Sequence, residues 1–131
     1  MAKITITHKK LTEDKLRINL NSGKIKLSSH LFKYRDKDTR QVVVYIPSLD
    51  ITGYGATDKK AMEMINFAIS NFFDWLTKLP HKQIDIELKK LGWEHVQYKS
   101  KEYSKSFVDE GGLLHSFNAV GDEVERLTIE A

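Results

Sequence analysis

A long helical stripe of apolar residues constrains the fold of this chain more than any other feature. The stripe follows a bend with two glycines, and its side chains recur at the three- and four-residue intervals of a helix that lies on a sheet. Its members are Ala61, Ile65, Ala68, Ile69, Phe72 and Leu76. Thr57 can cap the start of this helix, and Pro80 stops it from continuing. We therefore predict a helix over residues 58–78 with one face on a sheet.

Strand-like segments precede this helix. Residues 3–8, 16–20 and 24–27 alternate polar and apolar side chains, which is the period of a half-buried strand. Residues 41–46 contain an unbroken apolar run instead, which is typical of a strand covered on both faces. We expect this run to be the central strand. Pro47 would end it, because proline has no amide hydrogen for the ladder.

The residues after the long helix carry weaker signals. Residues 83–91 have the pattern of a short helix, and residues 123–129 alternate like a strand that closes the chain. Residues 94–112 lack a clear period. We therefore expect a loop there, with one strand at 94–98.

Together these patterns predict an α+β fold: an antiparallel three- to four-stranded sheet with one long helix packed on a face (β-β-β-α), then a short helix and a C-terminal strand. The 131 residues suit a single domain, with residues 1–80 as its main unit and residues 81–131 as an extension on the same core. Phe72, Phe73 and Trp75 cover more than one face of the helix, so we expect at least one aromatic to project. The short helix or another subunit would then cover it.

The available residue types exclude several kinds of chemistry. The chain has no cysteine, which rules out disulfides, thiol catalysis, thiolate zinc sites and iron–sulfur clusters. Its five histidines are too widely spaced for a paired-ligand motif, and the strands at 3–8, 24–27 and 42–46 carry no acid for a magnesium site. We predict no catalytic, metal or cofactor site, and Asp50 as a turn residue. The apolar runs fall far short of the ~20 residues that cross a bilayer, so we expect a cytoplasmic protein without a membrane partner.

Basic residues are concentrated in the first part of the chain. Residues 1–40 contain eleven basic and four acidic residues, a net charge of +7, whereas the remaining 91 residues carry −4. The alternate spacing of the basic residues favours one charged sheet face that contacts phosphates or an acidic partner, with an aromatic for stacking. The alternative is a solvated face whose lysines protect a sheet edge. The candidate contact residues are Lys24, Lys26, Lys33, Tyr34, Arg35, Lys37 and Arg40.

Residues 42–61, from the apolar strand into the helix, resemble the HicB family of antitoxin-like domains. In that family a strand runs into a Pro-Asp/Glu-Leu segment with a glycine, and Gly-x-Thr-x-x-Glu-Ala then opens a long amphipathic helix. The matching residues are Tyr45, Pro47, Leu49, Gly53, Gly55, Thr57 and Ala61. Lys60 stands where the family has Glu, and the resemblance covers residues 24–78.

The resemblance implies three or four antiparallel strands with a helix across one face, like an incomplete RNase H fold. Family antitoxins bind and block a small RNase toxin, and often repress their own operon through a C-terminal DNA-binding segment. Residues 82–131 show neither a ribbon-helix-helix nor a helix-turn-helix pattern, so we do not expect operator binding by this route. Leu88–Trp93 is similar to a segment of a bacterial HicB-like subgroup.

Three functional hypotheses follow, in order of preference. The first is a non-enzymatic HicB-like protein that acts by protein–protein binding. Its most specific version is an antitoxin that neutralises a small RNase toxin, and the protein would also form a homodimer. The second is a nucleic-acid-binding module that uses the basic face of residues 24–40. The third is an RNase centred on His30, because residues 28–30 faintly resemble the histidine strand of HicA-type RNase toxins. The alternative for this histidine is an ordinary strand residue.

Overall fold

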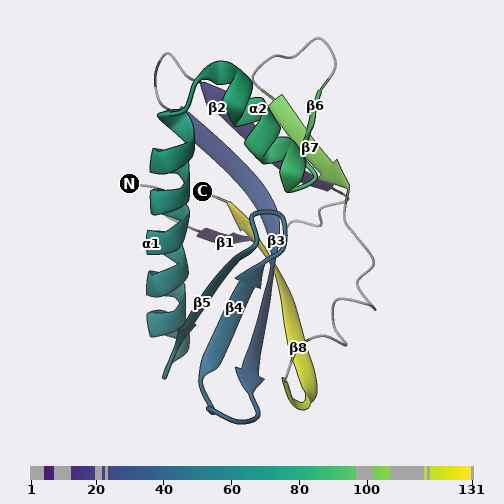
Figure 1. Cartoon of the computed structure of the whole chain (residues 1–131). Coiled ribbons are helices and arrows are strands. Elements are labelled where there is room, and N and C mark those ends of the chain that lie inside the picture. Colours follow the sequence, from purple (N-terminus) through teal and green to yellow (C-terminus); the bar gives the residue numbers. More distant parts are fainter. Residues whose placement is uncertain are drawn as a thin grey trace.

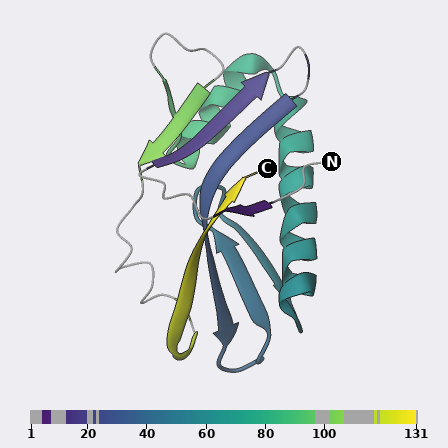
Figure 2. The same ribbon diagram turned by 180° about the vertical axis from the view of Figure 1, so that it is seen from behind.

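The structure of this chain, a computed structural model, describes residues 5–7, 13–19, 22, 24–96, 102–106, 117 and 119–130. These residues form one antiparallel sheet and two helices, shown from opposite sides in Figures 1 and 2. The elements are β1 (Thr5–Thr7), β2 (Glu13–Asn19), β3 (Lys24–Asp36), β4 (Val42–Ile46), β5 (Ile51–Gly55), α1 (Asp58–Thr77), α2 (His81–Lys90), β6 (Glu94–His95), β7 (Glu102–Ser106) and β8 (Ala119–Glu130). The α+β class is confirmed, but the expectation of three to four strands was wrong, because the described part of the sheet has eight.

β3 is the centre of the sheet. Along one edge it pairs with β8, and along the other edge its residues 24–28 pair with β2 and its residues 32–35 with β4. The run expected as the central strand is β4, which lies between β3 and β5, so this expectation was wrong. No glycine or proline interrupts residues 24–36, and the strand therefore continues through both half-sheets. In Figure 1, β2, β6 and β7 form the upper half-sheet, and β4 and β5 lie in the lower one.

A buried polar cluster fills the gap where β3 pairs with neither β2 nor β4. The Asp14 carboxylate takes the place of a strand there: its Oδ1 accepts the backbone N–H of His30 at 3.1 Å and lies 2.6 Å from the imidazole Nδ1. Ser29 Oγ lies 2.7 Å from Ser48 Oγ, and Trp93 Nε1 donates to the Ser48 carbonyl at 2.8 Å. All five residues are buried. Because buried polar groups need partners, these bonds hold the two half-sheets together.

α1 packs against β4 and β5 because both surfaces are apolar. Val44 and Ile46 of β4 and Ile65 and Ile69 of α1 are fully buried in one core. Gly53 of β5 permits the close approach of the helix, since a Cβ there would lie 2.8 Å from α1 backbone and side-chain atoms. Its lack of a side chain, rather than an unusual backbone angle, is what this position requires.

The first strands and the long helix were predicted well. The helix expected over 58–78 ends only one residue earlier, and the Thr57 hydroxyl accepts the Lys60 N–H at 3.2 Å as its cap. β1 lies within the strand expected at 3–8. β2 covers the strand expected at 16–20 apart from its last residue, which lies outside the described residues.

The residues after α1 contribute to the same core. The short helix expected over 83–91 is α2, which begins two residues earlier and buries Ile84 and Leu88. Trp93 and Tyr103 join them in the core beside β2. α2 thus lies over the upper half-sheet, as α1 lies over the lower one (Figure 1).

The last strands differ most from the prediction. The strand expected at 123–129 is part of the longer β8. The loop expected over 94–112 was wrong for β7, which pairs with β2. The apolar residue of β7 is Tyr103, whose side chain lies in the core, and a single apolar position creates no period to detect. β6 confirms the start of the strand expected at 94–98, whose last two residues lie outside the described part of the chain. No helix in the described residues is long and apolar enough to span a membrane.

Candidate functional site

β3 separates the basic residues that the sequence predicted as one face. Side chains alternate between the faces of a strand, so Lys24 and Lys26 lie on the face opposite to Lys33 and Arg35. Lys26 and Lys33 are also about 23 Å apart along the strand, at about 3.3 Å per residue. A strand was predicted only over residues 24–27, so the position of Lys33 and Arg35 on the same continuous strand, and with it the change of face, was not predicted. The expected residues therefore contribute to two different surfaces.

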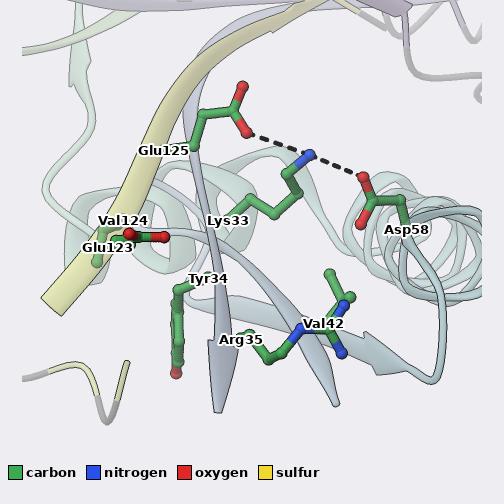
Figure 3. Close-up of a pocket in the computed structure, with 8 residues that line it drawn as sticks. All are labelled: Lys33, Tyr34, Arg35, Val42, Asp58, Glu123, Val124 and Glu125. Carbon is green, nitrogen blue, oxygen red and sulfur yellow. Dashed lines mark hydrogen bonds and ion pairs between the residues drawn. The ribbon is translucent and has the colours of Figure 1, made fainter. Parts of the chain in front are cut away.

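Lys33 lies in a groove of about 580 Å³ between β3, β8 and the start of α1 (Figure 3). Its Nζ is 2.9 Å from Asp58 Oδ2 and 3.2 Å from Glu125 Oε2. The hydrogen bond to Asp58 is the main reason that the pKa of Lys33 lies above its ordinary value. The bond to Glu125 acts in the same direction, and partial burial opposes both. The charge of Lys33 is thus neutralised by the chain itself.

The other predicted contact residues at this end are partly engaged. Arg35 Nη1 donates to the carbonyl of Arg40 at 2.6 Å and closes the turn between β3 and β4. Tyr34 stacks on Phe117 with ring centroids 4.8 Å apart, and burial raises the pKa of its phenol. One face of the Tyr34 ring is therefore already covered. Lys37 and Arg40 are exposed within the turn.

Lys24 and Lys26 share their face with two basic residues of β2 that the sequence analysis omitted. The strand register places Arg17 directly opposite Lys26, and Lys15 opposite Ser28. All four basic side chains are exposed, and no ion pair joins any of them to another described residue. The signal was present, because Lys15 and Arg17 lie in or beside a segment already predicted as a strand.

His30, on which the RNase hypothesis depends, is closed off from solvent, with 2% of its surface exposed. Its Nδ1 lies 2.6 Å from Asp14 Oδ1, a contact that suits the imidazole tautomer with its proton on Nδ1. This partner could not be predicted from local patterns, because Asp14 is sixteen residues away and reaches His30 through sheet pairing. Among the described residues, no group of three or more His, Cys, Asp or Glu side chains is placed to hold a metal ion.

The side of α1 that faces away from the sheet presents large apolar side chains to water. This α1 outer face consists of the exposed residues Lys60, Met64, Phe67, Asn71, Asp74 and Trp75. Phe67 is 60% exposed, Trp75 47% and Met64 38%. The expectation that one aromatic of the helix projects is met by Trp75, whereas Phe73 is buried. Phe67 is more exposed than Trp75, and its projection from the helix was not predicted.

Residues 42–61, whose sequence resembles HicB, contain residues with clear local roles. Tyr45 Oη donates to Asp50 at 2.9 Å across the turn, and Asp50 has a positive φ of 52°, as expected of a turn residue. Gly53 admits the helix, and Thr57 caps it. Comparisons with protein-family models, curated proteins and solved structures give no match to this chain. The resemblance to HicB therefore rests on these sequence positions alone.

Proposed function

We propose that this chain is a non-enzymatic HicB-like protein that acts by protein–protein contact, and that its α1 outer face joins it to a second copy of itself. The observation that carries this proposal is the exposure of Phe67, Trp75 and Met64 on one side of a single helix. Contiguous exposed apolar side chains with a polar rim are typical of interaction surfaces. Two such faces bury each other without exposing a new apolar patch.

The charges on this face are self-complementary. Lys60 and Asp74 lie seven residues on either side of Phe67, about 10.5 Å along the helix axis in each direction at about 1.5 Å per residue. If two α1 helices pack antiparallel about Phe67, Lys60 of each copy comes opposite Asp74 of the partner subunit. A twofold axis makes this contact twice, and it brings the two Phe67 rings together at its centre.

The edge of β5 beside α1 favours a dimer contact through side chains over one in which strands of two copies pair. β5 pairs only with β4 among the described strands, so its other edge is free of a strand partner. At that edge the N–H of Tyr54 donates to Met64 Sδ at 3.4 Å. Met64 thus covers part of the edge, in the way that native sheets limit edge-to-edge association. A helix from a second copy therefore fits this surface better than an added strand.

Sedimentation velocity tests this contact. We expect the wild-type chain to form a dimer and Phe67→Asp to sediment as a folded monomer, because a buried unpaired carboxylate disfavours the interface but costs the exposed position little. The matched control is Ile86→Asp on α2, also exposed at 48%, which keeps the dimer. A monomeric wild type would overturn the proposal that a second copy binds the α1 outer face, even if Phe67 then bound a different protein.

Toxin neutralisation is the sharpest form of the proposal, and it draws on the resemblance to HicB. The burial of His30 supports a binding protein over an RNase, because an acid–base group must reach its substrate. Co-expression with the product of a neighbouring small reading frame tests this form. Relief of growth arrest together with co-purification of the two chains supports it. Arrest that persists beside well-expressed, folded protein contradicts it.

A further inference from the structure

A second surface lies on the sheet face opposite to the helices. A groove of about 450 Å³ runs across β2, β3 and β7, and Lys15, Arg17 and Lys26 line it, with Lys24 beside them on β3. Two acids, Glu13 and Glu102, also line it, so basic residues exceed acidic ones by one in the lining and by two when Lys24 is counted. We call this surface the basic groove.

The basic residues are arranged in a way that the fold itself does not require. Arg17 stands directly opposite Lys26, and like charges in this position destabilise an antiparallel pair. On its other side Arg17 faces Glu102 of β7. No ion pair among the described residues involves Lys15, Arg17 or Lys26. Their positive charge is therefore available to an external anion.

The spacing of these residues fits an extended chain of anions. Alternate residues repeat about every 6.6–6.8 Å along a strand, and neighbouring strands are about 4.8 Å apart. Lys15, Arg17, Lys24 and Lys26 thus form a short two-strand array of cations. Successive phosphates of an extended nucleic-acid strand can each meet such a cation. A single strand is flexible enough to follow this array, so we favour it over a rigid duplex.

Among the described residues that line it, the groove offers no exposed ring on which a base could stack. The aromatic residue of this lining is Tyr103, which is 7% exposed, donates its hydroxyl proton to Asp85 and stacks on His95. The described lining therefore favours contact with the nucleic-acid backbone, which carries no sequence information. We propose that the basic groove binds the phosphate backbone of single-stranded nucleic acid without regard to its sequence. This site is independent of the α1 outer face.

Fluorescence anisotropy with a labelled single-stranded DNA of about 20 nucleotides, longer than most sites of this kind, tests the proposal. If four phosphates are neutralised, the logarithm of the association constant should fall linearly with the logarithm of the salt concentration, with a slope of about −2.8. Arg17→Gln/Lys26→Gln should halve this slope and weaken binding equally for two unrelated sequences. The matched control is Lys37→Gln/Arg40→Gln in the exposed turn, which removes the same charge and should leave the slope unchanged.

Three results would overturn the proposal. One is undetectable binding at low salt, and another is an equal loss in the two double variants, which would indicate attraction to net charge alone. The third is tighter binding to a duplex of the same length. Circular dichroism of both double variants verifies that they fold, so that loss of structure is not mistaken for loss of the site.

Discussion

The carboxylate of Asp14 offers the sharpest test of how the sheet is held together. It accepts the backbone N–H of His30 and faces the imidazole Nδ1, in the gap of β3 where neither β2 nor β4 supplies a partner. Asp14→Ala removes the oxygen that both groups of His30 contact. The substitution therefore acts on the joint between the half-sheets rather than on one strand.

The expected magnitude follows from the number of donors. A buried donor that loses its acceptor costs about 1–3 kcal/mol, so Asp14→Ala should lower the free energy of unfolding by about 2–6 kcal/mol. Asp14→Asn keeps one oxygen acceptor for the His30 N–H. With its amide oxygen in the position of Oδ1, the substituted side chain faces both donors as Asp14 does, and the expected loss from replacing the carboxylate by an amide is about 1 kcal/mol.

Urea unfolding followed by tryptophan fluorescence measures these differences, because Trp93 is buried beside the same cluster. The control is Glu13→Ala, the preceding residue, for which a change within about 0.5 kcal/mol is expected. The order should be wild type, Asp14→Asn, then Asp14→Ala. If Asp14→Ala matched the control, the role of the carboxylate as a substitute for a strand would be refuted. If Asp14→Ala did not fold, the milder Asp14→Asn would still give a measurable loss.

Two further substitutions probe the helix contact and the turn. Gly53→Ala should lower the free energy of unfolding by about 1–3 kcal/mol, because the added Cβ would meet the backbone of α1. The control is Thr52→Ala at the exposed neighbouring position, which should change this free energy by less than about 0.5 kcal/mol. Urea unfolding measures both. Burial and the hydrogen bond to Asp50 raise the pKa of Tyr45 to about 12, so spectrophotometric titration of Tyr45→Phe should lack a phenolate step near pH 12 that the wild type shows, while the late ionisation of Tyr103, whose pKa is also raised, remains. Since the raised pKa favours the neutral phenol, the stability that Tyr45 contributes is complete below about pH 10 and is lost as the pH rises toward 12. Equal unfolding curves for wild type and Tyr45→Phe across that pH range would contradict this expectation.

Local patterns predicted the elements whose signals are local. The stripe from Ala61 to Leu76 defined α1, and the alternation around Leu16 and Ile18 defined β2. These elements bury one face each, so the period of their apolar residues reports directly on their structure. The position of β3 at the centre was not predictable in this way, because pairing partners are set by contacts between distant segments.

The candidate surfaces were predictable only in part for the same reason. A row of basic residues near Lys24 and Lys26 was recognised, but their cross-strand neighbour Arg17 depends on the register of β2 with β3. The partner of His30 likewise required the fold, since Asp14 reaches it across the sheet. On α1 the exposed Phe67 lies outside the apolar stripe, and a search for the buried face passes over such a residue.

The most direct test of the proposed α1 contact is a charge reversal between Lys60 and Asp74. Lys60→Glu places an acid in the first turn of α1, and Asp74→Lys places a base near its end, so both changes suit the helix dipole. Any loss of dimer therefore does not reflect a weaker helix. Exposed ion pairs contribute about 0.2–1 kcal/mol each. A single reversal replaces two attractive contacts by two repulsive ones of similar size, which should weaken the free energy of dimerisation by about 1–4 kcal/mol.

The measurement is the dimer dissociation constant of four proteins by sedimentation equilibrium. We predict that each single reversal raises the constant, by roughly fivefold to several hundredfold, and that Lys60→Glu/Asp74→Lys restores it to near the wild-type value. This recovery is specific to two helices packed antiparallel about Phe67. If the double variant were no tighter than the single ones, or if no variant changed the constant, the proposed contact between α1 outer faces would be contradicted.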